Sequence, residues 1–308
     1  MNPLQSARLP FLMQLTSGRA DIVVGLIDGP VAQAHPDLAG AKLRELAGAS
    51  ASACLQTDSM ACRHGTFVAG ILCGRRQSAA PSICPDCTLL VRPIFSAAPA
   101  DMGEMVSATP GELAAAIFEC IAAGARVLNL SVALISPSGK SERMLEEALN
   151  HALSQGVLIV AAAGNQGTIG SSVITRHPWV IPVTACDQQG RPLGGSNLAL
   201  SLGRRGLSAP GDRITSLDPA GAPLTLSGTS FAVPFVTGAI ALLLSAFPDA
   251  LAAVVKLTVI RSGAGTRTSV VPPLLDAVAA YQILAANQRR RCAARLGRGP
   301  KDRTAHSS

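Results

Sequence analysis

The sequence has few aromatic and few charged residues for its length. Of its 308 residues, 3% are aromatic and 15% are charged, whereas 48% are hydrophobic. The scarcity of aromatic rings argues against the base-stacking surfaces of single-strand nucleic-acid binders. The hydrophobic share excludes a disordered chain, and a chain of this length folds without needing a disulfide or a metal.

Long hydrophobic runs are also missing. The longest apolar stretches, residues 156–164 and 236–247, are shorter than the ~20 residues of a membrane-spanning helix, so we expect no membrane span. The apolar patch Leu9–Leu15 near the N-terminus lacks a small-residue cleavage site after it. It therefore does not fit a signal peptide, and we expect a cytoplasmic protein.

The net charge of +7 is concentrated at one end of the chain. Residues 289–308 hold seven Lys or Arg and one Asp, which leaves +1 on the rest. We therefore expect a folded domain over residues 1–288 and a basic, disordered tail over residues 289–308. Such a tail either keeps the protein soluble or binds an acidic surface. The nearly neutral body gives no reason to expect a nucleic-acid partner, and the oligomeric state is not indicated.

Buried apolar runs alternate with helical patterns along the chain. Strands are expected at residues 22–27, 89–94, 127–132, 157–162 and 179–185, and helices at residues 65–72, 111–123, 141–155, 231–247 and 274–288. This alternation predicts an α/β fold with a mainly parallel sheet covered by helices on both faces. Functional residues in such sheets lie beyond the carboxyl ends of the strands.

Three side chains in this framework suggest nucleophilic catalysis. Asp28 ends a buried strand, His64 stands at the start of a predicted helix, and Ser230 begins the long helix after Gly228. A serine needs a base to become a nucleophile, and an imidazole titrates near neutral pH. A carboxylate can hold that imidazole in the required tautomer. Pro234 is expected within about the first turn of the helix, where its missing N–H costs little.

Two groups can stabilise an oxyanion. The backbone N–H of Ser230 lies at a helix start, where N–H groups lack helical acceptors. Asn165 follows the strand over residues 157–162, and its side-chain amide can supply a second donor.

At these positions the sequence resembles the subtilisin-like serine proteases of the S8 family. The runs HGTFVAG, AAAGN and SGTSFAVP occur with the chain order Asp, His, Ser of that family. The resemblance implies the subtilisin-like three-layer fold and a peptide or protein substrate, with no cofactor. It makes Asp28 the orienting acid, His64 the base, Ser230 the nucleophile and Asn165 an oxyanion donor.

Three further stretches, IDGPVAQAHPDL, CTLLVRPIF and LSAPGD, are similar to the proteases of cyanobactin maturation. That type cuts leader peptides from ribosomally made precursors and lacks an inhibitory propeptide. Only 27 residues precede Asp28, and the short interval from Asp28 to His64 favours hydrolysis over cyclisation. We therefore expect maturation of a precursor peptide by leader removal. The alternatives are a general intracellular protease and a catalytically silent peptide-binding relative.

The same resemblance indicates where the substrate would bind, as a strand added along the cleft. The implied substrate-binding residues are Ser131, Val132, Ala133, Ala162, Ala163 and Gly164. Many subtilisins have glycines where Ala133 and Leu134 stand, so we expect these side chains to narrow the cleft.

The cysteines leave three interpretations open. Cys84 and Cys87 form a C-x-x-C pair that could bind zinc together with Cys54, Cys62 or Cys73. A disulfide in this region is the second possibility, and free thiols are the default for a cytoplasmic chain. Cys120 is expected in the core.

Calcium is common among subtilisins, and Asp37 matches one of their calcium-binding aspartates. The loop near residues 74–83, which should supply the other ligands, reads GRRQSAAPSI and has no carboxylate. Calcium needs several oxygen ligands and a negative balance, so we expect neither calcium nor another metal.

Overall fold

The computed structural model describes residues 2–46, 54, 57–95, 107–134, 139–263 and 268–296. Their centre is a seven-stranded parallel sheet in the order β2-β3-β1-β5-β7-β8-β9. The strands are β1 (Val23–Asp28), β2 (Lys42–Glu45), β3 (Thr88–Pro93), β5 (Val127–Leu130), β7 (Leu158–Ala162), β8 (Val180–Cys186) and β9 (Leu207–Pro210). The α/β fold predicted from the alternating pattern is confirmed.

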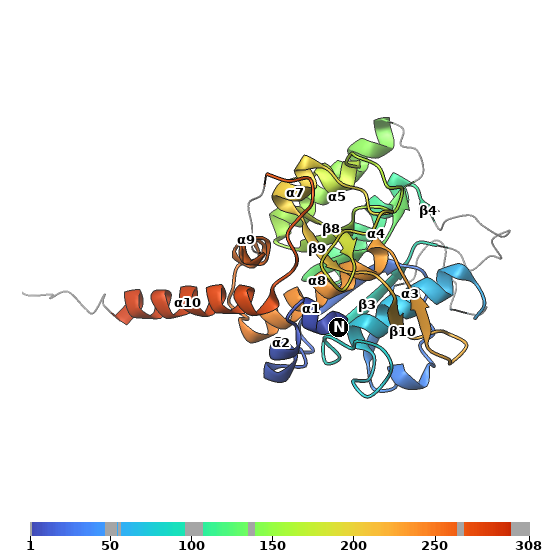
Figure 1. The fold of residues 1–308 in the computed structure, drawn as a ribbon, viewed down its shortest axis with the longest axis horizontal. Coiled ribbons are helices and arrows are strands. Elements are labelled where there is room, and N and C mark those ends of the chain that lie inside the picture. Colours follow the sequence, from blue (N-terminus) through green and yellow to red (C-terminus); the bar gives the residue numbers. More distant parts are fainter. Residues whose placement is uncertain are drawn as a thin grey trace, which may run out of the picture.

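Helices cover both faces of this sheet (Figure 1). The helix α8 contacts α3 and four sheet strands on one face, while α4 contacts α5 on the other. The helices are α1 (Pro3–Ser6), α2 (Pro10–Leu15), α3 (Met60–Cys73), α4 (Pro110–Ala122), α5 (Gly139–Gln155), α6 (Val173–Arg176), α7 (Leu200–Arg205), α8 (Thr229–Ala246), α9 (Ala252–Ser262) and α10 (Ala277–Leu296). Two small sheets pair β4 (Ser107–Ala108) with β6 (Ala133–Leu134), and β10 (Ile214–Ser216) with β11 (Leu224–Leu226). A single 3₁₀ turn spans Pro36–Leu38 in the described part of the chain.

The helix α3 begins four residues before the predicted start at His64. Ser59 caps it, since its hydroxyl accepts a hydrogen bond from the N–H of Cys62 at 3.2 Å. The prediction that the helix begins at His64 was therefore wrong. His64 lies in the second turn of α3, where the helix rather than a loop fixes its position.

The C-terminal helix is longer than predicted. α10 continues to Leu296, so the first eight residues of the expected tail are helical in their backbone. In Figure 1 this helix projects away from the body of the protein, and its main contacts with other helices are with α9 and α2. Residues 297–308 lie outside the described residues, and the division at residue 288 stays a prediction.

Apolar segments of both ends of the chain are part of the core. Leu9 and Leu12, from the N-terminal apolar patch, are at most 1% exposed. The helix α8 has 18 residues with a mean hydropathy of 1.8, which is long and apolar enough for a membrane span. However, 89% of it is buried inside the protein, as expected for the central helix of a folded core.

Two glycines let α3 pack closely against the end of β1. A Cβ atom on Gly65 would lie 2.3 Å from the carbonyl oxygen of Gly29 and 2.5 Å from that of Pro30. These are backbone atoms that cannot rotate away. The contact therefore sets the distance between the residues that precede these glycines, His64 on the helix and Asp28 on the strand.

We predict that Gly65→Ala lowers the free energy of unfolding by about 1–3 kcal/mol, as overpacking does in a tight contact. Urea unfolding would measure it. Gly111→Ala is the matched control, because a Cβ atom there meets nothing within 4 Å, and it should change stability by less than about 1 kcal/mol. Equal losses in the two variants would contradict the prediction.

Candidate active site

Asp28 and His64 form a direct hydrogen bond. Asp28 is the last residue of β1 and is fully buried, while the His64 side chain is 20% exposed. His64 Nδ1 lies 2.6 Å from Asp28 Oδ1, which also accepts the N–H of Gly29 at 2.6 Å. With the carboxylate accepting at Oδ1, Nδ1 holds the proton, and Nε2 of a neutral His64 is left as the base.

The environment of His64 sets its pKa. Burial lowers the pKa, but the charge of the Asp28 carboxylate and its hydrogen bond raise it by more, so the net direction is upward. The imidazolium is therefore stabilised in the folded protein, as a base that must take up a proton requires.

Ser230 is the second residue of α8 and is partly exposed. The helix begins after Gly228, whose φ of 151° favours glycine. The ring of the next residue, Phe231, lies 5.3 Å from the His64 ring between centroids. The start of α8 and the histidine of α3 therefore lie together. No hydrogen bond joins Ser230 Oγ to His64, and such bonds are often long before substrate binds.

Pro234 is the sixth residue of α8, in its second turn, so the expectation that its missing N–H costs little there was wrong. Its missing N–H would have bonded the carbonyl oxygen of Ser230, four residues earlier. Ser131 replaces that donor, because its hydroxyl donates to the Ser230 carbonyl oxygen at 3.0 Å. Ser131 is 4% exposed, so its side chain supports the helix carrying Ser230 rather than lining an open cleft.

A buried amide fixes Ser131 in turn. Asn129 in β5 is fully buried and donates from Nδ2 to Ser131 Oγ at 3.0 Å. Its Oδ1 accepts the hydroxyl of Thr237, in α8, at 2.9 Å. The sequence analysis missed both Asn129 and Thr237. The available signal was a polar residue within the apolar run 127–132.

Asn165 is oriented by the first residue of α8. Its Oδ1 accepts both the N–H and the hydroxyl of Thr229, each at 2.9 Å. Since Asn165 Oδ1 is bonded to Thr229, the Nδ2 donor on the other side of the amide is available to an oxyanion. The amide of Asn165 and the N–H of Ser230 thus come from adjoining positions, as an oxyanion site requires.

Asn197, which the sequence analysis also missed, holds the loop that carries Asn165. Its Oδ1 accepts the backbone N–H groups of Gln166 and Thr168, both at 3.1 Å. Its Nδ2 donates to the carbonyl oxygen of Ala163 at 3.1 Å, and its N–H donates to that of Gly164 at 2.9 Å. Nothing in the local sequence distinguished this asparagine, which lies 29 to 34 residues from its partners in the loop it holds.

The remaining predicted substrate-binding residues stay predictions. Val132, between β5 and β6, and Ala162, at the end of β7, are both partly buried. The N–H of the buried Ala163 donates to the carbonyl oxygen of Val183. The backbone of Ala133 lies in β6, beside β4. The side chains of Ala133 and Leu134 lie outside the described residues.

The cysteines separate into a disulfide and buried thiols. Cys54 and Cys62 form a disulfide, with Cα atoms 5.4 Å apart. For these two cysteines the disulfide alternative holds and the free-thiol alternative does not. Cys62 is then no zinc ligand, and no cluster of three metal-binding side chains occurs among the described residues. Burial raises the pKa of the Cys73 and Cys120 thiols to about 12, so both are unreactive. Cys120 is in the core, as predicted, and the Cys292 side chain lies outside the described residues.

The residues near Asp37 do not fit a calcium ion. The guanidinium of Arg75 donates to Asp37 Oδ1 from Nη2 at 2.7 Å and from Nε at 3.2 Å. A cation thus already neutralises the carboxylate, and the loop that follows contributes no acidic side chain.

Comparison with known proteins agrees with this geometry. A profile of the subtilase family matches residues 19–290. The chain belongs to the subtilase family. It is therefore a serine endopeptidase, a hydrolase of peptide bonds. Among curated relatives, subtilisin DY of Bacillus licheniformis is 30% identical over 242 residues, which cover 77% of this chain and 81% of that protein.

Two solved structures are similar to this subtilase in fold and sequence. A serine-to-alanine mutant of the protease domain of PatA has a TM-score of 0.79 and 34% identity, covering 88% of this chain and 97% of that one. The prenylagaramide maturation protease PagA has a TM-score of 0.78 and 31% identity, covering 90% and 98%. The likeness to cyanobactin maturation proteases inferred from the sequence is confirmed.

We predict that Asp28→Asn lowers the pKa of His64, because burial remains while the attraction of the carboxylate is lost. An NMR titration of the His64 ring would show the shift. The native pair has a raised folded-state pKa, so its stabilisation is full below the unfolded pKa of about 6.5 and is lost as the pH rises through the folded pKa. Asp28→Asn should therefore lack this extra stability at low pH.

Asp37→Asn is the control for this titration, since Asp37 pairs with Arg75 and should leave the His64 titration unchanged. An unaltered His64 pKa in Asp28→Asn would contradict the assignment of the shift to this carboxylate.

Proposed function

We propose that this subtilase matures a ribosomally made precursor peptide by removing its leader, with Ser230 as nucleophile. The observation that carries the catalytic part is the Asp28–His64 hydrogen bond beside the start of α8. The likeness to PatA and PagA, the second of which is described as a maturation protease, supports the choice of substrate.

The reaction begins at the hydroxyl of Ser230. His64 Nε2 takes the proton as Oγ attacks the peptide carbonyl carbon, and Asp28 stabilises the resulting imidazolium. Negative charge moves to the carbonyl oxygen, where Asn165 Nδ2 and the Ser230 N–H donate to it. The C–N bond then breaks as His64 passes its proton to the leaving amine, which leaves an acyl-enzyme on Ser230.

Water completes the cycle by the same steps. His64 takes a proton from the water, whose oxygen attacks the acyl carbon, and Oγ leaves with the proton that His64 returns. Every proton moves through His64, so we propose that no metal or other cofactor takes part. The ion pair between Arg75 and Asp37 supports this for calcium.

The location in the cell stays a prediction. A cytoplasmic location is proposed from the sequence alone, and the Cys54–Cys62 disulfide is of a kind that is rare there.

We predict that a fluorophosphonate probe labels the folded chain at Ser230, with a bond from phosphorus to Oγ and loss of fluoride. Ser230→Ala should abolish labelling, while Ser227→Ala, in the same loop, should keep it. Mass spectrometry of the labelled protein identifies the residue that carries the label. In a separate assay of peptide cleavage, Asn165→Ala should lower kcat by about 10²–10³-fold. A folded chain without labelling would be a peptide-binding relative, contrary to the proposal.

Maturation is separated from general proteolysis by the choice of substrate. We predict that precursor peptides encoded beside the gene are cut once, between leader and core, whereas unfolded casein is cut slowly or not at all. Mass spectrometry of the products measures both. Many cuts in casein at comparable rates would favour the general protease instead.

A further inference from the structure

The aromatic ring of Phe231 lies against the ring of His64. Phe231 follows Ser230 in the first turn of α8, and its N–H donates to the carbonyl oxygen of Gly228 at 3.2 Å. The centroids of the Phe231 and His64 rings are 5.3 Å apart, and the ring planes are inclined at 43°. Phe231 therefore contacts the proposed base, while its backbone is joined directly to the proposed nucleophile.

A second phenylalanine, in α3, supports the ring of Phe231. The Phe67 ring lies 4.7 Å from the Phe231 ring between centroids, with an angle of 59° between the planes. Phe67 stands three residues after His64, so these two side chains are neighbours on one face of α3. Phe67 is fully buried, and Phe231 is 7% exposed. The close packing of the interior therefore restricts the Phe231 ring and, with it, the space left to the His64 ring.

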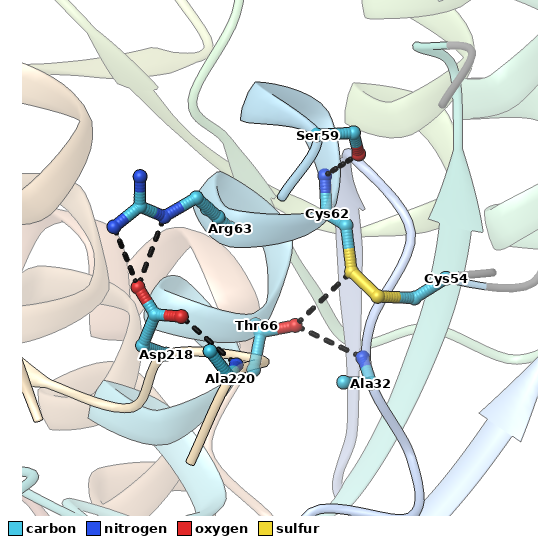
Figure 2. The surroundings of a disulfide bond; sticks show 8 residues. All are labelled: Ala32, Cys54, Ser59, Cys62, Arg63, Thr66, Asp218 and Ala220. Carbon is cyan, nitrogen blue, oxygen red and sulfur yellow. Dashed lines mark hydrogen bonds and ion pairs between the residues drawn. A yellow bond between two sulfur atoms is a disulfide. The ribbon is translucent and has the colours of Figure 1, made fainter. Parts of the chain in front are cut away.

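Three residues of α3 close to His64 hold neighbouring loops (Figure 2). They are Cys62, which forms the disulfide with Cys54, Arg63, whose Nη2 pairs with Asp218 Oδ2 at 2.8 Å, and Thr66, whose Oγ1 accepts the N–H of Ala32 at 2.9 Å. These contacts fix the backbone of the helix. They leave open the direction of the His64 side chain, because a side chain on a fixed backbone still has a choice of staggered rotamers.

The hydrogen bond to Asp28 does not by itself fix that direction. It holds one atom, Nδ1, whereas the reaction uses Nε2 on the other side of the ring. A ring held at one atom can swing about it, and the His64 side chain is 20% exposed, so solvent gives it room to do so. A second contact on the ring is needed to direct Nε2 at the Ser230 hydroxyl. Phe231 provides such a contact.

We propose that Phe231 is a positioning residue, which packs against the His64 ring and holds Nε2 toward the hydroxyl of Ser230. This rests on the peptide cleavage at Ser230 set out under the proposed function. Phe231 has no group that exchanges a proton, so it acts through His64. Because it directly follows Ser230, a shift of the start of α8 moves the nucleophile and the packing surface of the base together. The covalent chain thus helps to keep their spacing.

Phe231→Ala tests the proposal, because it removes the ring and keeps the backbone of α8. For a peptide that the unaltered chain cuts, kcat should fall by about 10- to 100-fold, as expected when a reacting group is slightly misplaced. KM should change by less than about 2-fold, because the contact serves the reaction and not the binding of the peptide. Phe231→Leu keeps an apolar side chain but no flat ring, and it should show the same division between kcat and KM if Phe231→Ala does not fold.

Phe247→Ala is the matched control. Phe247 follows the last residue of α8 and is also 7% exposed, and its ring packs against that of Tyr281 with the centroids 5.2 Å apart. Its truncation removes the same number of atoms from the core at the other end of the helix, so it should keep the native kcat. Equal kcat values in Phe231→Ala and Phe247→Ala would overturn the proposal, as would a loss in Phe231→Ala that is confined to KM.

Proton NMR reports the position of the His64 ring without a substrate. The proton on Nδ1 is protected from exchange with water while the ring stays on the Asp28 carboxylate. Its exchange should be about 10-fold faster in Phe231→Ala, since an aromatic contact that stabilises the packed position is lost, and unchanged in Phe247→Ala. An unchanged rate in Phe231→Ala would overturn the proposal. If the unaltered chain cuts no peptide, the proposed function fails instead, and this exchange rate alone decides whether Phe231 positions His64.

Discussion

The hydrogen bond from Ser131 to the carbonyl oxygen of Ser230 is the contact on which the geometry of the site depends. Pro234 removes the N–H that the helix would normally offer to this oxygen. A buried carbonyl left unpaired would cost free energy and would let the first turn of α8 shift. By supplying the donor from the end of β5, the protein fixes the start of α8 to the sheet, and with it both Ser230, the proposed nucleophile, and its N–H, a proposed oxyanion donor.

The parallel sheet explains why the other groups meet at the same place. β1, β5 and β7 are neighbours, and Ile27 pairs with Leu130, which pairs with Ala161. One residue further on, the three strands reach Asp28, Ser131 and Ala162 at the same level, in strands about 4.8 Å apart. Residues far apart in the chain thus form one row at the carboxyl edge, over which α8 begins.

The local sequence was enough to predict the residues that end strands or begin the long helix, because buried apolar runs mark the strand ends and Gly228 marks the helix start. It was insufficient wherever a tertiary partner decides the structure. The start of α3 was missed because polar residues such as Arg63 precede His64, and Ser59 was not recognised as a cap. Asn129, Asn197 and the Cys54–Cys62 pairing depend on partners that no local pattern reveals.

These two kinds of residue also differ in what they control. The strand ends and α8 carry the groups proposed to act on the peptide bond, while the loops beside them are attached to the turn of α3 that bears His64. Cys62, Arg63 and Thr66 hold these loops, and His64 of the same turn bonds Asp28. A shift of that turn would therefore move the loops and the Asp28–His64 pair together. The geometry of the pair thus depends on the packing of loops that contribute no group to it.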